Sequence, residues 1–208
     1  MLLSELVVLE TPQLIDPISN YGIANLEQNK QLYRFLSRRP KQLISKISDD
    51  IELVRIEEPG GDDFNYQYVG LDHEFKQIGL VDHIVEARDN IIGSYAYQSL
   101  IWVGNDYKST FSRWPHKIVF EYLLPKYKTV TTDELHTPLG MKYWVQLVKS
   151  AISKGLNVYY YNKRARQVIQ IHDPQELSAL QGQYKIWDHG PEGTDKILVI
   201  SSRFIEEQ

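Results

Sequence analysis

One change in the spacing of the apolar residues constrains the fold of this chain more than any other feature. Before residue 105 the period is about two, and four runs, at 51–58, 64–72, 77–87 and 93–104, are predicted to be strands. The links between these runs are short and polar, and links this short make neighbouring strands antiparallel. After residue 105 the period becomes about 3.6, which is typical of helices.

The second half of the chain is predicted to alternate helices with strands. A helix is expected at 115–127, a short strand at 128–132 and a further helix at 137–155. The second helix begins at a Thr-Pro pair and ends at a Lys-Gly pair, which are typical start and stop signals. A step from strand to helix to strand returns as a right-handed crossover, so the strands at 95–103 and 128–132 are expected to be parallel.

The two ends of the chain are predicted to add helices and strands to this arrangement. The segment 21–40 is expected to form a helix that stops before its proline. The runs at 156–162 and 166–173 are expected to form a hairpin. A short helix is predicted to start at Asp173, and 196–204 is expected to be the last strand.

These elements predict an α+β fold with one mixed central sheet flanked by helices. No internal repeat and no linker rich in proline, glycine or serine divides the chain, so 1–208 is expected to be a single domain. Within it, 1–50 is predicted to be a less regular N-terminal helical segment, and 164–208 to supply C-terminal strands. A core of this size buries roughly 70% of the unfolded chain's surface and needs no metal or disulfide.

Composition excludes several classes of function. The chain has no cysteine, which excludes a disulfide framework, thiolate zinc sites and a cysteine nucleophile. Its 23 basic and 27 acidic side chains leave a net charge of −4, so neither nucleic acid nor a membrane is expected as a partner. The six histidines are scattered without the spacing of helical metal ligands, and no metal is expected. The opening run, MLLSELVVLE, is broken by acids too early for a signal peptide, and a cytoplasmic location is expected.

A polar cluster lies at the corner between the strand at 128–132 and the helix after it. Asp133, Glu134 and His136 stand at the carboxyl end of a central strand, where ligands of open sheets commonly bind. A carboxylate beside a histidine can deprotonate an amine and so act as a general base. The same acids also suit the positive end of the following helix, where Thr137 is a natural N-cap. A catalytic site and a capped turn are both consistent with this corner.

The order of elements over residues 51–163 resembles the GNAT-type N-acyltransferase fold. The resemblance rests on the stretch from 97 to 161, YQSLIWVGNDYKSTFSRWPHKIVFEYLLPKYKTVTTDELHTPLGMKYWVQLVKSAISKGLNVYYY. It implies acetyl-CoA or another acyl-CoA as cofactor, with the pyrophosphate at the end of the family's fourth strand and the start of the next helix. The residues that the resemblance implies for cofactor binding are Trp102, Val103, Ser109, Thr110, Ser112, Arg113 and Lys117.

Two positions depart from the family pattern. The family loop has Arg or Gln, two residues, Gly, one residue and then Gly or Ala, whereas 106–124 contains no glycine. Glycines there let bare backbone approach the phosphates. The family's tyrosine acid falls at Trp144, whose indole cannot serve as an acid at neutral pH, and Tyr143 beside it is the expected substitute. The expected catalytic residues are therefore Asp133, Glu134, His136 and Tyr143.

The stretch from 131 to 144, TTDELHTPLGMKYW, also resembles uncharacterised proteins of tailed bacteriophages. Together the two resemblances lead to two expected functions. The first is a bacteriophage-type accessory protein with a degenerate GNAT-like fold. Such a protein would bind a host or phage protein in the host cytoplasm, without standard acetyl transfer. The alternative is an acyl-CoA-dependent N-acyltransferase that acts on an amine of a protein or a small molecule.

Overall fold

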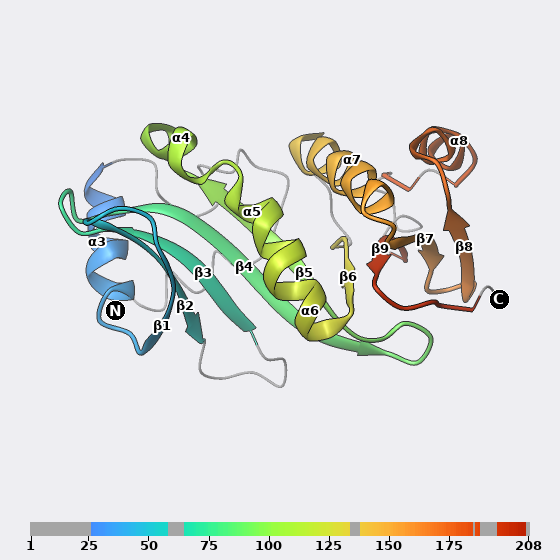
Figure 1. The fold of residues 1–208 in the computed structure, drawn as a ribbon, viewed down its shortest axis with the longest axis horizontal. Coiled ribbons are helices and arrows are strands. Elements are labelled where there is room, and N and C mark those ends of the chain that lie inside the picture. Colours follow the sequence, from blue (N-terminus) through green and yellow to red (C-terminus); the bar gives the residue numbers. More distant parts are fainter. Residues whose placement is uncertain (1–25, 58–64, 134–137, 185, 188–194, 207–208) are drawn as a thin grey trace. The chain divides into compact units, whose positions relative to one another are not determined.

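The computed structural model describes residues 26–57, 65–133, 138–184, 186–187 and 195–206 (Figure 1). Within these residues the fold is α+β with one mixed sheet of nine strands, which confirms the predicted fold class. In their order across the sheet, the strands are β1 (Lys41–Lys46), β2 (Ile51–Glu57), β3 (Asn65–Asp72), β4 (Gln77–Asp89), β5 (Gly93–Val103), β6 (Thr129–Thr131), β9 (Lys196–Ser201), β7 (Asn157–Asn162) and β8 (Gln167–Ile171).

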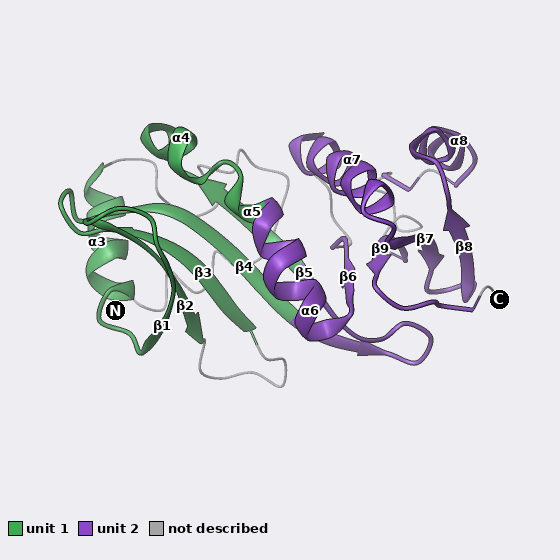
Figure 2. Ribbon diagram, in the orientation of Figure 1, with its two compact units in different colours: residues 1–85, 98–115 green, residues 86–97, 116–208 purple. Residues whose placement is uncertain are grey.

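The chain groups into two compact units (Figure 2). Unit 1 holds residues 1–85 and 98–115, and unit 2 holds residues 86–97 and 116–208. Strands β4 and β5 each contribute residues to both units. Each unit has a hydrophobic core cluster of its own.

In unit 1 the first four strands form an antiparallel meander. β1 pairs with β2, β2 with β3 and β3 with β4, as the short links require. β1 is not predicted by the sequence, which places residues 41–46 in a less regular helical segment. Four of its six residues are exposed, and it is the first strand in the order of the sheet. An edge strand packs against few neighbours, so its apolar pattern is weak.

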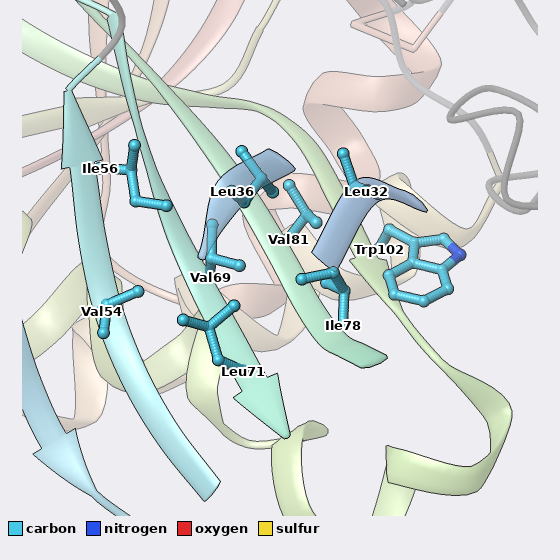
Figure 3. Packing of buried hydrophobic residues seen from close by; sticks show 9 residues of the cluster. All are labelled: Leu32, Leu36, Val54, Ile56, Val69, Leu71, Ile78, Val81 and Trp102. Carbon is cyan, nitrogen blue, oxygen red and sulfur yellow. The ribbon is translucent and has the colours of Figure 1, made fainter. Parts of the chain in front are cut away.

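Helix α3 (Leu26–Leu36) packs on this meander and confirms the helix predicted near the N-terminus (Figure 3). The shared core cluster is Leu32, Leu36, Val54, Ile56, Val69, Leu71, Ile78, Val81 and Trp102. Buried Asn29 ties the helix to β4, because its Nδ2 donates to the Ile78 carbonyl at 3.0 Å. Its Oδ1 accepts from the Ile78 N–H at 2.6 Å. The asparagine therefore satisfies both backbone groups of a buried residue at the start of the strand.

The opposite face of the meander carries Phe111. This residue ends the short helix α4 (Lys108–Phe111), which follows the 3₁₀ turn η1 (Asn105–Tyr107). A Cβ added at Gly79 would lie 2.6 Å from the Phe111 ring, so glycine lets the ring rest directly on the strand. Tyr107 donates from its hydroxyl to Asp72 Oδ2 at 2.7 Å, which fixes the turn to the end of β3.

One carboxyl group of unit 1 is fully buried. Asp82 in β4 has no exposed surface, and its Oδ2 accepts a hydrogen bond from Gln98 Nε2 at 2.6 Å. Its Oδ1 has no hydrogen-bond partner among the described residues. Burial raises the pKa of this carboxyl well above its ordinary value, and the bond from Gln98 opposes that shift.

In unit 2 a parallel pair of strands is extended by antiparallel ones. β5 and β6 run parallel, with Ala96 opposite Val130 and Tyr97 opposite Thr131, which confirms the predicted parallel pairing. β6 pairs antiparallel with β9, β9 with β7 and β7 with β8, so the predicted hairpin at 156–173 is also confirmed. The core cluster of this unit is rich in tyrosine and includes Tyr95, Tyr159, Tyr161, Ile197 and Val199.

The remaining helices follow the predicted order. A continuous helical stretch runs through α5 (Trp114–Lys117), the π-helical segment η2 (Ile118–Leu123) and α6 (Leu124–Tyr127). Helix α7 (Pro138–Ser153) precedes β7, and α8 (Pro174–Tyr184) follows β8 and is longer than predicted. Within the part of the chain that the structure describes, no helix is long and apolar enough to cross a membrane.

Candidate functional site

An open pocket of about 550 Å³ lies entirely in unit 2, and we name it the lysine groove. Its apolar lining comes from Phe120, Leu124, Pro125 and Leu156. Its charged side chains are Lys117, Glu121, Lys128 and Lys154, and His116 and Ser202 complete the lining. A volume of this size is within the range of ordinary ligand pockets.

The first wall of the lysine groove is an irregular helix. The π-helical segment η2 supplies Phe120 and Glu121, and single π turns inside helices are frequent at functional sites. The helix ends at Lys128, whose N–H donates to the Leu124 carbonyl at 2.9 Å. Lys128 adopts a left-handed conformation with φ 65°, where glycine is the usual residue. Its carbonyl accepts from the Ser202 N–H at 2.9 Å, which holds this conformation in place.

The second wall is the end of helix α7. Gly155 has φ 70°, and its N–H donates to the Ile152 carbonyl at 2.9 Å. The N–H of Leu156 donates to the Ala151 carbonyl at 3.0 Å, which completes a glycine helix stop. The stop fixes the direction of the chain on both sides of the glycine. Lys154 and Leu156 are therefore presented to the groove by the same turn.

The groove carries an excess of positive charge. Three lysines face one glutamate, so at neutral pH the cations outnumber the anions by two. Lys117 Nζ lies 4.0 Å from Glu121, and Lys128 Nζ donates to the Pro125 carbonyl at 2.9 Å. Lys154 Nζ lies 5.4 Å from the centre of the Phe120 ring, within the range of a cation–π contact. Lys154 therefore places one of these positive charges over the apolar lining of the groove.

His116 adds no charge to the groove near neutral pH. Burial lowers the pKa of its imidazole, and the nearby Lys154 lowers it further. Its Nε2 lies 3.0 Å from Ser150 Oγ on α7, and its ring lies 4.7 Å from the Phe120 ring. The imidazole is therefore a neutral, anchored side chain that gains a charge when the solution is acidified.

The arrangement suits a ligand that is both apolar and anionic. Phe120, Leu124, Pro125 and Leu156 remove apolar surface of a ligand from water, while the lysines attract its negative charge. Lys128 and Lys154 also lie at helix carboxyl ends, where cations stabilise the helix itself. Replacing either lysine is expected to lower stability if the lysine only caps its helix, and to lower ligand affinity as well if it also binds the ligand.

The residues expected to bind acyl-CoA lie mostly in unit 1. Trp102 is 4% exposed and packs in the core cluster with α3 (Figure 3). Val103 is half-buried and ends β5. Ser109 and Thr110 belong to helix α4, and Ser112 and Arg113 lie between α4 and α5. Lys117 is the member of this set that lines the lysine groove. The short helix α4 thus lies in the segment for which the resemblance predicted a cofactor-binding loop.

The expected catalytic residues are described in part. Asp133 follows β6 and is half-buried, as is Tyr143 on α7. Glu134 and His136 lie outside the described residues, as does the expected cap Thr137. Trp144 is 3% exposed and lies on the buried stripe of α7, so its indole is a core side chain.

The sequence did not point to the groove as a site. His116, Lys128 and Lys154 come from three helix positions that are far apart in the chain, so no local motif contains them. The sequence does place both lysines beside helix ends, because Lys128 directly follows the helix predicted at 115–127 and Lys154 lies at the end of the helix predicted at 137–155. Lysines at helix ends are common for electrostatic reasons alone, and this placement does not distinguish a site from a cap.

Among the described residues, no group of three or more histidine, aspartate or glutamate side chains is placed to hold a metal ion. Comparison of the chain with protein-family models, with curated proteins and with solved structures finds no match. The functional conclusion therefore depends on the geometry and chemistry of the lysine groove.

Proposed function

We propose that this protein binds a partner protein through the lysine groove and carries out no standard acetyl transfer. The observation that carries the proposal is the position of three lysines around an apolar floor in an open pocket. The partner segment that fits it is acidic and has at least one large apolar side chain. The apolar side chain would rest on Phe120 and Leu124, and carboxylates would meet the lysines.

In this proposal the protein has a degenerate GNAT-like fold, which supports the binding groove but lacks the family's chemistry. The parallel pairing of β5 with β6, followed by α7 and β7, is consistent with the order of elements in that family. Two features speak against its usual chemistry: α4 lies in the segment for which the resemblance predicted a cofactor-binding loop, and Trp144 is buried in the core. The resemblance to bacteriophage proteins makes a host or phage protein in the host cytoplasm the expected source of the partner.

A second candidate function is an acyl-CoA-dependent N-acyltransferase for an amine of a protein or a small molecule. It is favoured by the same charge excess, because lysines can also meet the phosphates of a CoA. Binding would then involve the phosphates rather than carboxylates of a peptide. Titration with acetyl-CoA therefore separates the two candidates.

A peptide-display selection tests the proposal. The native chain is the target, and a Lys128→Glu/Lys154→Glu double variant is used for counter-selection. The expected consensus is rich in aspartate and glutamate around one leucine, phenylalanine or other large apolar residue. Circular dichroism and thermal unfolding of the double variant check that its fold is retained, since both lysines are exposed.

Two results would contradict the proposal. One is a selection that enriches no peptide, or only peptides without acidic residues. The other is calorimetric binding of acetyl-CoA that the double variant abolishes, which would favour the acyltransferase. Absence of heat up to millimolar acetyl-CoA would remove that second candidate, since it corresponds to binding weaker than about −4 kcal/mol.

A further inference from the structure

Three side chains of unit 1 form a hydrogen-bonded chain that is separate from the lysine groove. Tyr33 on α3 has its Oη 2.8 Å from Nδ1 of His73, which follows β3. The other ring nitrogen, His73 Nε2, lies 3.1 Å from Glu52 Oε2 on β2. The side chains of His73 and Glu52 are 34% and 29% exposed, and Tyr33 is half-buried. These three side chains are therefore accessible from solvent.

The carboxylate decides where the protons lie. An ionised glutamate only accepts hydrogen bonds, so His73 Nε2 carries the hydrogen and donates to Glu52. In the neutral imidazole, Nδ1 then has the free electron pair and accepts the hydrogen bond from the Tyr33 hydroxyl. This is the order of groups found in carboxylate–histidine–nucleophile sites, in which the base is oriented by an acid on its far side.

Each of the three groups is held by an independent anchor. Tyr33 follows Leu32 in the core cluster, on a helix that Asn29 fastens to Ile78. The backbone N–H of His73 donates to the Asp50 carbonyl at 2.8 Å. Glu52 lies opposite Leu71 in the register of β2 and β3. Since these anchors belong to the folded scaffold, the geometry is in place before a substrate arrives.

The surroundings decide which substrates fit. Burial raises the pKa of the Tyr33 hydroxyl, and the charges of Asp72 and Glu52 raise it further, so the side chain is a phenol at neutral pH. A phenol must lose its proton to a base before it can attack an electrophile, and His73 is in contact with the Tyr33 hydroxyl. The same two carboxylates repel a phosphate or another anion. Uncharged electrophiles are therefore favoured.

We propose that Tyr33 is a nucleophile for acyl groups, activated by His73 and Glu52, and that it accepts uncharged activated carboxylic esters. Tyr33 Oη forms a bond to the ester carbonyl carbon, and its proton moves to His73 Nδ1. The bond between that carbon and the leaving oxygen then breaks, and the leaving alcohol takes the proton from His73. The product is an aryl ester on Tyr33. Water hydrolyses it to the carboxylic acid and free Tyr33, with His73 again accepting and returning the proton.

The test uses p-nitrophenyl acetate as the uncharged ester and p-nitrophenyl phosphate as the anionic comparison. Release of nitrophenol and mass spectrometry of tryptic peptides give the rate and position of acetylation. The expected site is Tyr33, and His73→Gln is expected to lower its acetylation rate about a hundredfold, as loss of a general base does. Glu52→Gln keeps the shape and an acceptor at the far ring nitrogen, and a smaller decrease is expected. The phosphate is expected to be unreactive.

Tyr122 of the native chain serves as the matched control, because it is also half-buried and burial also raises the pKa of its hydroxyl. Acetylation of Tyr33 no faster than that of Tyr122 would overturn the proposal. This comparison uses the native chain, so it decides the matter even if a variant fails to fold.

Discussion

Lys128 adopts a backbone conformation that is unfavourable for every residue that has a side chain. Its φ of 65° lies in the left-handed region, which costs such a residue roughly 1–2 kcal/mol relative to the right-handed one. Glycine is the usual residue at this place in a helix stop, and Gly155 has it at the end of α7. Strained backbone conformations of this kind are concentrated at functional sites, and here the strained residue carries a side chain that lines a pocket. Lys128 is therefore the residue most informative about the lysine groove.

Replacement of Lys128 separates conformation from charge. Lys128→Gly is expected to be more stable than Lys128→Ala by about 1 kcal/mol, because only glycine adopts the left-handed region without strain. Both variants lose the cation and are expected to bind an acidic peptide equally weakly. Urea denaturation gives the stabilities, and fluorescence anisotropy gives the affinities. An alanine variant at least as stable as the glycine variant would contradict this account of the helix end.

Asp82 makes stability depend on pH. Its native-state pKa is raised above the ordinary value of 3.8, so the unfolded chain releases this proton first as the pH rises. The contribution of protonated Asp82 to stability is therefore fully present below about pH 3.8, the ordinary pKa, and is lost as the pH rises through the native pKa. Asp82→Asn keeps an acceptor for Gln98 and cannot ionise, so it is expected to be more stable than the native chain at neutral pH. Urea denaturation at several pH values measures this. A gain that does not shrink towards acid pH would contradict it.

At the scale of elements, the sequence predicts best what is locally determined. The helix at α7 and its glycine stop follow from apolar spacing and from Gly155, and the parallel pairing of β5 and β6 follows from chain connectivity. β1 was missed because it lies at the edge of the sheet and exposes Leu43, so alternation does not mark it. The lysine groove was missed because its walls come from helix ends that meet only in the folded chain.

The attachment of α3 to β4 offers a prediction for an element. Asn29→Ala leaves the N–H and carbonyl of Ile78 without their partner, and a loss of about 2 kcal/mol or more in unfolding free energy is expected. Gln31→Ala on the exposed face of the same helix is the control and is expected to change stability by less than about 0.5 kcal/mol. Equilibrium urea denaturation gives both values. Equal effects of the two substitutions would contradict the role of Asn29.

At the scale of the whole molecule, the two units carry different chemistry. Unit 1 holds the acidic and hydrogen-bonded set around Tyr33, and unit 2 holds the cationic lysine groove. The chain as a whole has a net charge of −4, so the groove is a local basic region on an acidic protein. A local excess of positive charge of this kind attracts an acidic partner.

The most direct measurement is a titration of one selected acidic peptide into matched charge-reversal variants. Lys154→Glu changes a residue of the lysine groove, and Lys149→Glu makes the same change on α7 at a residue that does not line the groove. At low salt, Lys154→Glu is expected to weaken binding at least about tenfold, which is about 1.4 kcal/mol, and Lys149→Glu less than about twofold. If both variants weaken binding equally, or neither does, the lysine groove is not the binding site.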